Sequence, residues 1–423
     1  MASKTLTVFE HQTIRVSEDR TAFTQADYDA LINIDTQVPN GMLMREGTSD
    51  IRFKQFVGNI FLENGTTIEI LPKVNRNASQ DSQCCRASLI YMLEHALSLD
   101  ITSIGNGPDQ LHRSSLQECL INHFTQLLQA QLDKTVIRSY QGKQENLNTI
   151  RGRINFTQNL NQNIANRAKF VCDFDELTVD NPHNQQIKAL LGVLVNRVTN
   201  QQLQQQMIQL RGLFAGVKKV VASSQVITKL PYNRRNGSFA PIMKLGAMLL
   251  DGYAPGLSDG KHTAPAMLFD MNKLFEQFIA AQIRLVVAKE PSLRQLQVNT
   301  QDQSKSLAVN AFGLQPDIVI KSNESTIVLD TKWKDLSSHD VSQADAYQMY
   351  AYASRYGAKY NGLIYPETMQ VNQRSFQLYM DHSNQSDTTL DVIQLPVQLN
   401  TQEERNRLQE QILQLLHRAT EAV

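Results

Sequence analysis

Two short apolar runs that each meet an aspartate constrain this chain more than any other feature. They lie in residues 314–334, LQPDIVIKSNESTIVLDTKWK, as DIVIK and TIVLD. Apolar runs of this length, separated by turn residues, predict two paired strands. If the turn is centred on Asn323-Glu324, Asp317 lies directly opposite Asp330, with Cβ atoms roughly 5 Å apart. A three-residue loop would shift the register by one residue and separate the two carboxylates.

The acids and the lysine of this hairpin suggest a metal site. Side chains alternate along a strand, so Asp330 and Lys332 project to the same side. Two close carboxylates repel each other, and a cation between them relieves the repulsion; Mg²⁺ is commonly held by one or two carboxylates and several waters. We therefore predict metal-assisted phosphodiester hydrolysis, with Asp317 and Asp330 as Mg²⁺ ligands and the Thr331 carbonyl as a further ligand. Lys332 would activate the attacking water or stabilise charge on the phosphate.

The alternative is a surface hairpin whose charged ends face water and in which Lys332 only pairs with Asp330. The following segment, QADAYQMYAY, favours the site. In a helix its Asp345, Gln348 and Tyr352 share one face, beside the Asp-x-Lys strand. Tyr347 and Tyr350 are expected to be ordinary helix-face aromatics.

Two further residues stand near this segment in the sequence. Glu276, in NKLFEQFI, is a candidate third carboxylate for the metal, and its alternative is a solvated glutamate on an amphipathic helix. His339 follows Lys332 by seven residues, and we expect it to be a loop residue with local hydrogen bonds.

The 423 residues predict two or three domains. Residues 1–160 are expected to be β-rich and then helical, with a hairpin turn at Asn64-Gly65. Residues 161–255 follow a helical pattern, and residues 254–265 form the best linker candidate. From 265 to 423 the order is helix, strands, helix, strands, helix, which indicates an α/β domain. Within it, MLFDMNKLFEQFIAAQIRLVVAK is predicted as one long helix, and Thr401-x-x-Glu404 as the cap of the last helix.

Composition limits the other possibilities. Lysine plus arginine and aspartate plus glutamate both number 41, so a net charge of zero argues against coating nucleic acid by bulk electrostatics. The pairs Lys218-Lys219 and Arg234-Arg235 are expected to be solvated rather than bound to DNA. Neither a signal peptide nor an apolar run of membrane-spanning length is present, and we expect a cytoplasmic protein. The four cysteines, Cys84, Cys85, Cys119 and Cys172, are then expected to be free and reduced.

The motifs also carry a family resemblance. The PD…DTK pattern resembles the PD-(D/E)xK nuclease signature, and Gln348-x-x-x-Tyr352 resembles the QxxxY element of its RecB-like branch. From about residue 50 to 365 the chain resembles the McrC family of modification-dependent restriction systems. The stretches that carry this likeness are VGNIFLENGTTIEILPKV, ENLNTIRGRINFTQNL, CDFDELTVDNPHNQQIKALL, AMLFDMNKLFEQFI and QADAYQMYAY.

The resemblance implies an α/β multidomain protein. Its N-terminal part, residues 1–160, would dock on McrB, a hexameric AAA+ GTPase that reads methylated cytosine. Residues 265–423 would form a PD-(D/E)xK restriction-endonuclease-like domain that cuts both strands of DNA, and the chain would stimulate GTP hydrolysis. On this basis Asp317 and Asp330 match the metal-binding acids and Lys332 the catalytic lysine. Gln348 and Tyr352 match the supporting helix.

Three questions stay open from the sequence. The chain is alternatively a non-catalytic activator of the GTPase, or a stand-alone RecB-like exonuclease that degrades DNA ends. Arg151 or Arg153 is a candidate arginine finger for the partner's nucleotide. The preferred interpretation is that these arginines pair with nearby acids such as Glu145.

Overall fold

The computed structural model describes residues 4–19, 21–33, 42–46, 49–73, 81–96, 116–166, 168–251, 266–309, 311–322, 325–336, 341–367, 374–380 and 388–421. Its contacts divide the chain into two compact units: Met1–Cys119 together with Asp251–Val423, and Leu120–Leu250. The domains predicted from the sequence, residues 1–160, 161–255 and 265–423, have other boundaries than these two units and stay a prediction.

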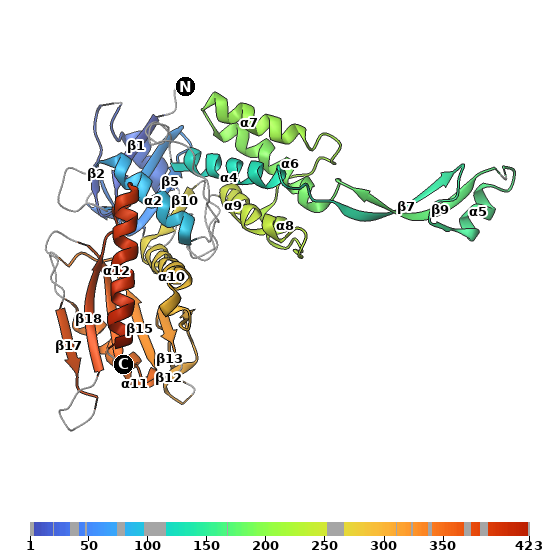
Figure 1. Cartoon of the computed structure of the whole chain (residues 1–423). Coiled ribbons are helices and arrows are strands. Elements are labelled where there is room, and N and C mark those ends of the chain that lie inside the picture. Colours follow the sequence, from blue (N-terminus) through green and yellow to red (C-terminus); the bar gives the residue numbers. More distant parts are fainter. Residues whose placement is uncertain are drawn as a thin grey trace. The chain divides into compact units, whose positions relative to one another are not determined.

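The N-terminal part of the first unit is built on a four-stranded sheet. Its order is β1 (Lys4–Phe9), β6 (Thr66–Leu71), β5 (Phe56–Phe61) and β10 (Ala266–Asp270) (Figure 1). The predicted turn between β5 and β6 is confirmed: Gly65 has φ +86°, and Thr66 N–H donates to Asn64 Oδ1 at 3.0 Å. Positive φ explains the glycine. The remaining elements here are β2 (Thr13–Arg15), β3 (Leu43–Glu46), β4 (Asp50–Phe53), α1 (Gln25–Asn33) and α2 (Ser82–Ala96).

One prediction for this region is wrong. The segment MLFD is not the start of the long helix, because residues 266–270 form β10 and pair antiparallel with β5. Helix α10 (Met271–Lys289) begins only after Asp270, whose side chain accepts a hydrogen bond from Asn272 N–H at the helix N-terminus. Apolar residues are compatible with both helix and strand, and pairing with a distant strand decides here. The candidate linker, 254–265, lies outside the described residues.

The C-terminal part of the first unit is a six-stranded mixed sheet. The order is β11 (Gln297–Thr300), β14 (Ile318–Lys321), β15 (Thr326–Thr331), β16 (Tyr360–Pro366), β18 (Thr388–Leu395) and β17 (Arg374–Leu378). Strands β15, β16 and β18 run parallel, whereas β14 and β17 are antiparallel to their neighbours. A small hairpin of β12 (Lys305–Ala308) and β13 (Ala311–Leu314) precedes β14. This is the mixed α/β arrangement that the sequence predicts.

Helices α10, α11 (Gln343–Tyr356) and α12 (Gln402–Glu421) contact this sheet. Met349 and Tyr352 of α11 share a buried core with Val328 and Leu363 of the central strands. Helix α11 ends at Gly357, which has φ +62° and terminates the helix in the left-handed conformation. The predicted cap of α12 is confirmed, because Thr401 and Glu404 exchange hydrogen bonds of 2.9 and 3.2 Å.

The second unit is mainly helical, as expected for residues 161–255, except that Phe170–Thr178 form strand β9. Its helices are α4 (Leu116–Leu132), α5 (Phe156–Gln162), α6 (Pro182–Leu194), α7 (Gln201–Gly212), α8 (Ser224–Thr228) and α9 (Ala240–Asp251), of which the first and last cross the unit boundary. The glutamine-rich segment is α7, which buries Leu203, Met207 and Leu210 on one side. Amphipathic spacing thus outweighs its polar composition.

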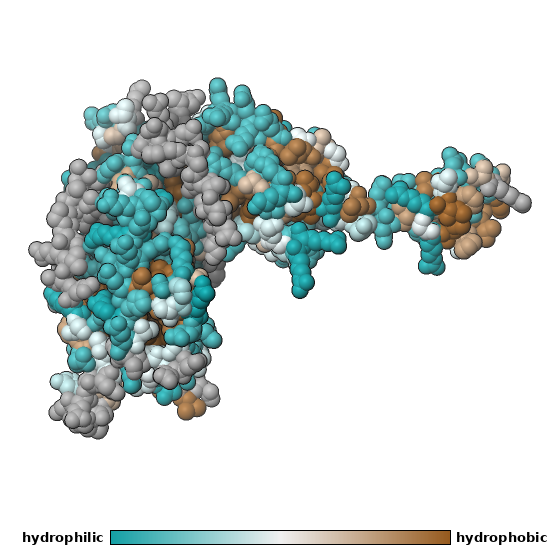
Figure 2. Space-filling view, viewed as in Figure 1, coloured by the Kyte–Doolittle hydropathy of each residue, from teal (hydrophilic) through white to brown (hydrophobic). Residues whose placement is uncertain are grey.

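A long hairpin arm projects from this unit (Figure 1). Strand β7 (Ser139–Leu147) pairs with β9 (Phe170–Thr178) along its full length, and β8 (Arg153–Ile154) and α5 lie at the tip. Gly152 is required there: its φ is +68°, and a Cβ would lie 2.5 Å from the Asp173 carbonyl oxygen. Figure 2 shows apolar side chains gathered at the tip. The large exposed apolar residues of the segment between β7 and β9 are Ile150, Phe156, Leu160 and Ile164, which are 58%, 72%, 66% and 79% exposed.

Two expectations concern the whole chain. As predicted, none of the four cysteines forms a disulfide. Among the described residues, none of the helices has the length and apolar character needed to cross a bilayer.

Candidate active site

The β14–β15 hairpin has the register that brings the two aspartates together. Ile318 pairs with Leu329 and Lys321 with Thr326, so the next pair outward is Asp317 and Asp330. Ser322 N–H donates to Ser325 O at 2.9 Å, which leaves a two-residue connection. Asn323 and Glu324, the predicted turn centre, lie outside the described residues. The predicted register is confirmed.

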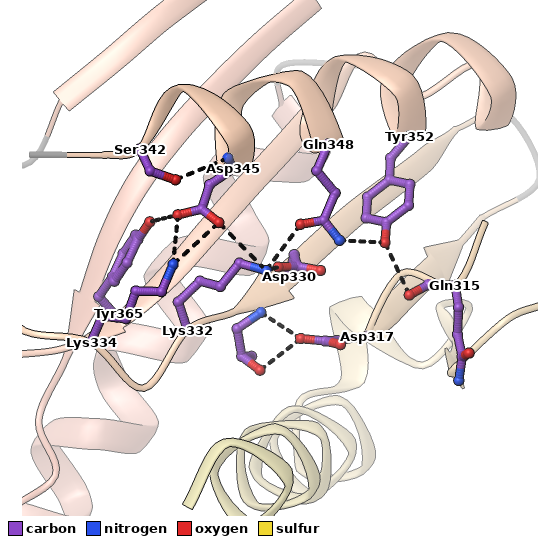
Figure 3. A network of polar contacts seen from close by, with 11 residues as sticks. Gln315, Asp317, Asp330, Lys332, Lys334, Ser342, Asp345, Gln348, Tyr352 and Tyr365 are labelled. Carbon is purple, nitrogen blue, oxygen red and sulfur yellow. Dashed lines mark hydrogen bonds and ion pairs between the residues drawn. The ribbon is translucent and has the colours of Figure 1, made fainter. Parts of the chain in front are cut away.

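Thr331 holds Asp317 in place at the end of the hairpin. One carboxylate oxygen, Asp317 Oδ2, accepts hydrogen bonds from Thr331 N–H at 2.6 Å and from the Thr331 hydroxyl at 2.7 Å (Figure 3). These contacts leave the other oxygen, Oδ1, as the Asp317 atom not engaged by Thr331. The side chain of Thr331 was not assigned a role from sequence, because such a local contact depends on the strand geometry. Its carbonyl as a metal ligand stays a prediction.

Lys332 lies at the centre of the polar network in Figure 3. Its Nζ is 2.6 Å from Asp330 Oδ2, donates to Gln348 Oε1 at 3.0 Å and is 3.8 Å from Asp345 Oδ1. Burial disfavours the ammonium, but the charges of Asp330, Asp345 and Asp317 and the hydrogen bond to Asp330 together outweigh burial, and the pKa of Lys332 is raised. Lys332 is therefore positively charged at neutral pH.

The face of α11 predicted from residue spacing points into this network. Gln348 Nε2 donates to the Tyr352 hydroxyl at 2.8 Å, and that hydroxyl donates to Gln315 O at 3.0 Å. The acceptor, Gln315, lies two residues before Asp317. This chain of hydrogen bonds therefore ties the amide that contacts Lys332 to the start of the hairpin.

Asp345 shares the face but has a different partner from Gln348. Its carboxylate binds Lys334 Nζ at 3.1 Å, and its backbone N–H donates a hydrogen bond to Ser342 Oγ at 3.1 Å. Lys334 lies farther out than Lys332: their side chains are 55% and 18% exposed. Both lysines therefore contact α11, but Lys332 is the more buried of the two.

Glu276 approaches the acids from α10. Its Oε1 accepts a hydrogen bond from Gln301 Nε2 at 2.9 Å. Burial raises the pKa of Glu276, and the charge of Asp330 raises it further. The sequence interpretation of Glu276 as a carboxylate near the site therefore agrees with its position, and its role as a metal ligand stays a prediction. Gln301, which fixes it, was not found from the sequence.

The pKa values of both aspartates are raised. Burial raises the pKa of Asp317 to about 6, with a further contribution from the charge of Glu276. Burial and the charge of Asp317 likewise raise the pKa of Asp330 to about 6. Asp330 is 2% exposed. Carboxyl groups whose pKa is raised in this way are often found in reactive sites.

The donor set fits a divalent cation in part. Asp317 and Asp330 lie opposite each other at the end of the hairpin, and burial raises the pKa of both. A cation would relieve the repulsion between the two carboxylates, although Lys332 Nζ already lies 2.6 Å from Asp330 Oδ2. Across the described ranges, no three His, Cys, Asp or Glu side chains are grouped so as to hold a metal by themselves. The arrangement is therefore compatible with Mg²⁺ held by one or two carboxylates and water, not with a closed protein cage.

The other candidates from the sequence lie elsewhere or are ordinary. Tyr347 and Tyr350 are 65% and 43% exposed, whereas Tyr352 is 3% exposed and belongs to the core. Lys218, Lys219, Arg234 and Arg235 are exposed, as expected for solvated charges. His339 lies outside the described residues.

Arg151, which lies beside the middle of β9, has partners within the arm. Its Nη1 is 3.7 Å from Glu176 Oε1, and its guanidinium lies 4.2 Å from the centre of the Phe174 ring. Pairing with an acid agrees with the preferred interpretation, although the acid is Glu176 and not Glu145. Arg153 is exposed.

Comparisons with known proteins agree with the resemblance found in the sequence. A family model described as "McrBC 5-methylcytosine restriction system component" matches residues 51–366. No curated protein matches the chain. Two solved structures have similar folds. One is a half-complex from a tetradecameric assembly of Thermococcus gammatolerans McrB AAA+ hexamers with bound McrC, with a TM-score of 0.72, 19% identity, and coverage of 97% of this chain and 100% of that chain.

The other is the cryo-EM structure of the Thermococcus gammatolerans McrBC complex. Its TM-score is 0.52 at 22% identity, over 68% of this chain and 89% of that chain. At these identities the likeness establishes the fold, and the family model, which covers most of the sequence, establishes the family. The chain belongs to the family of the McrBC 5-methylcytosine restriction system component.

Proposed function

We propose that this chain is the Mg²⁺-dependent endonuclease subunit of a McrBC-type restriction complex. It would cut double-stranded, methylated DNA and stimulate GTP hydrolysis by a hexameric AAA+ partner. The observation that carries the proposal is the position of Lys332, which lies 2.6 Å from Asp330 and 3.0 Å from Gln348 beside the Asp317–Asp330 pair. Family membership supports it.

The surrounding sheet supports a PD-(D/E)xK layout for residues 265–423. An antiparallel hairpin carries both acids and the lysine, and a parallel strand, β16, follows with α11 packed on the sheet. The connection through α11 from β15 to β16 is a βαβ crossover, which places helix residues over the strand that carries the acid. The Gln348-x-x-x-Tyr352 face would then support the site, not react in it.

Asp317 and Asp330 would hold the Mg²⁺, with the Thr331 carbonyl and Glu276 as the further ligands predicted. When bound, Mg²⁺ supplies Lewis-acid stabilisation of the phosphate and a water of lowered pKa. The chain's own contribution is to set the donors. Thr331 turns Asp317, and Lys332 places an ammonium beside Asp330, where it can orient the attacking water and stabilise developing negative charge.

The hairpin arm supports a contact with another protein. Four large apolar side chains of the segment that joins β7 to β9 are more than half exposed: Ile150, Phe156, Leu160 and Ile164. Exposed apolar side chains that gather in one place usually mark an interaction site. The net charge of zero agrees with a division of labour in which the partner captures the DNA.

The test is to purify the chain with the proposed AAA+ GTPase partner and to measure GTP turnover and DNA cleavage together. We expect cleavage of methylated duplex DNA only with the partner and Mg²⁺. GTPase stimulation without cleavage under all metal conditions would instead identify a non-catalytic activator. Degradation of DNA ends by this chain alone would identify a stand-alone exonuclease.

A further inference from the structure

The residue after the central lysine makes a contact far from it in the sequence. Trp333 is the only tryptophan of the chain and is 5% exposed. Its indole N–H points at the carboxylate of Glu10 and lies 3.0 Å from each of the two oxygens. Glu10 itself is completely buried. A buried carboxylate that shares one N–H between both oxygens is a charge-assisted contact, the stronger class of hydrogen bond.

Glu10 is in turn fixed to the N-terminal sheet. It follows β1 directly, and its backbone N–H donates to Leu71 O at the end of β6 at 2.9 Å. Its carboxylate oxygen Oε1 also accepts a hydrogen bond from Lys73 N–H at 2.9 Å. Glu10 is therefore held by backbone hydrogen bonds at the ends of the paired strands β1 and β6.

The other side of Trp333 contacts α10. The rings of Trp333 and Phe275 meet edge to face, with centres 5.2 Å apart. Phe275 immediately precedes Glu276, which faces the aspartate pair. Helix α10 continues from β10, a strand of the same N-terminal sheet, and Met271 N–H donates to Gln55 O at 2.9 Å. Trp333 thus lies where the N-terminal sheet reaches the acidic site.

The backbone around Lys332 explains why this contact matters. Strand β15 ends at Thr331, so Lys332 lies just beyond the regular ladder. Its N–H still donates to Ile364 O at 2.8 Å, and Lys334 N–H donates to Lys332 O at 2.9 Å. Regular strand pairing ends at this point, and the buried hydrogen bond of the neighbouring Trp333 restrains the backbone next to Lys332.

We propose that Glu10 is a positioning residue for Lys332. By holding the Trp333 indole, it fixes the backbone from which the lysine reaches Asp330, and the N-terminal sheet thereby sets the geometry of the site. This inference rests on the proposed nuclease function for its kinetic consequence. A shift of the N-terminal sheet would be passed to Lys332 through this contact, since both of its ends are buried.

The kinetic test uses Glu10→Gln in the full complex. Glutamine keeps the size but turns one acceptor into an N–H₂ group that faces the indole N–H. The matched control is Asp27→Asn, because Asp27 is also a buried carboxylate of the N-terminal part, and its partners there include Lys4, Thr24 and Asn64. We expect kcat for cleavage to fall about tenfold in Glu10→Gln with KM unchanged, and to stay within twofold in Asp27→Asn.

A double-mutant cycle with Trp333→Phe isolates the contact, because phenylalanine keeps a ring against Phe275 and removes the N–H. We expect the double variant to cleave no more slowly than the slower single variant. Independent, multiplied losses in the double variant would overturn the proposal. So would a kcat for Glu10→Gln equal to that of Asp27→Asn at equal folded fraction.

A second measurement does not depend on DNA cleavage. We expect Glu10→Gln to change the emission of the single tryptophan and to raise hydrogen exchange in the peptide 326–336 of the metal-free protein, where Lys332 N–H is bonded to Ile364 O. Asp27→Asn should change neither. If the wild-type complex fails to cut DNA, the proposed function is wrong, yet this second measurement still tests whether Glu10 positions Lys332. Unchanged exchange and emission in Glu10→Gln would refute it.

Discussion

Replacing Lys332 by methionine is the substitution for which the geometry of the site gives the most detailed prediction about cleavage. Methionine keeps most of the length of the side chain and removes the ammonium that lies 2.6 Å from Asp330 Oδ2 and donates to Gln348 at 3.0 Å. The lysine side chain is only 18% exposed, so water replaces its charge poorly. We expect cleavage to fall by about 10²–10⁴-fold, or about 3–5 kcal/mol of transition-state stabilisation.

A second consequence concerns the acids. The charge of Lys332 lowers the pKa of both Asp317 and Asp330, against the burial that raises it. Without the lysine, the pair retains a proton to higher pH. Since carboxylates must be deprotonated to bind a metal, the variant should also bind Mg²⁺ more weakly at neutral pH.

Lys334→Met is the matched control. Lys334 also pairs with α11, through Asp345 at 3.1 Å, but its side chain is 55% exposed. Exposed ion pairs contribute about 0.2–1 kcal/mol, so we expect less than about a fivefold change in cleavage. The assay is single-turnover cleavage of a methylated duplex by the assembled complex, with GTP turnover measured in parallel.

The reasoning is refuted if Lys332→Met cuts at the wild-type rate, or if Lys334→Met loses as much activity as Lys332→Met. Loss of GTPase stimulation in Lys332→Met would also count against it, because the lysine would then act in assembly and not in strand scission.

Three further predictions concern the network, the acids and the arm. Tyr352→Phe removes the hydroxyl between Gln348 and the backbone of the hairpin, and thermal or urea unfolding should show a loss of about 1–2 kcal/mol. The pKa values of Asp317 and Asp330 are raised above the unfolded value, so the folded state binds protons more tightly, and metal-free stability should fall as pH rises from about 4 to 6, by up to about 3 kcal/mol for each acid. Adding Mg²⁺ should raise the melting temperature at pH 7 and not at pH 5; an equal effect at both would contradict the assignment. Phe156→Asp, at a position 72% exposed, should leave stability within about 0.5 kcal/mol and weaken co-purification with the GTPase.

The sequence predicted the acidic hairpin because its signals are local. The length of the apolar runs and the turn residues set the register, which places Asp317 opposite Asp330. Helical spacing likewise predicted that Gln348 and Tyr352 share a face, and hydrogen bonding between them confirms it. Residues two, four or seven positions apart have their relative directions fixed by the element itself.

The missed features depend on partners distant in the sequence. The apolar run of β10 matched a helix as well as a strand, and its pairing with β5, about 200 residues earlier, decides between them. The arm was missed for a related reason. Strand β7 is mostly exposed and polar, so it lacks the alternation by which strands are recognised, and its pairing with β9 stabilises it.

The contact between Glu10 and Trp333 could not be predicted from the sequence either. The two residues are 323 positions apart, and neither belongs to a recognisable motif. A glutamate at the end of a strand is usually exposed, and only the packed structure reveals that this one is buried with a donor.

The central claim is that Asp317 and Asp330 form a divalent-cation site beside Lys332. A crystal structure of the protein soaked in Mn²⁺, with the metal located by its anomalous signal, tests this most directly. The account predicts a peak in contact with both aspartates, which is absent after Asp330→Asn, while Lys332 stays within reach of the metal-bound water. A peak elsewhere in the chain, or the same peak after Asp330→Asn, would contradict it.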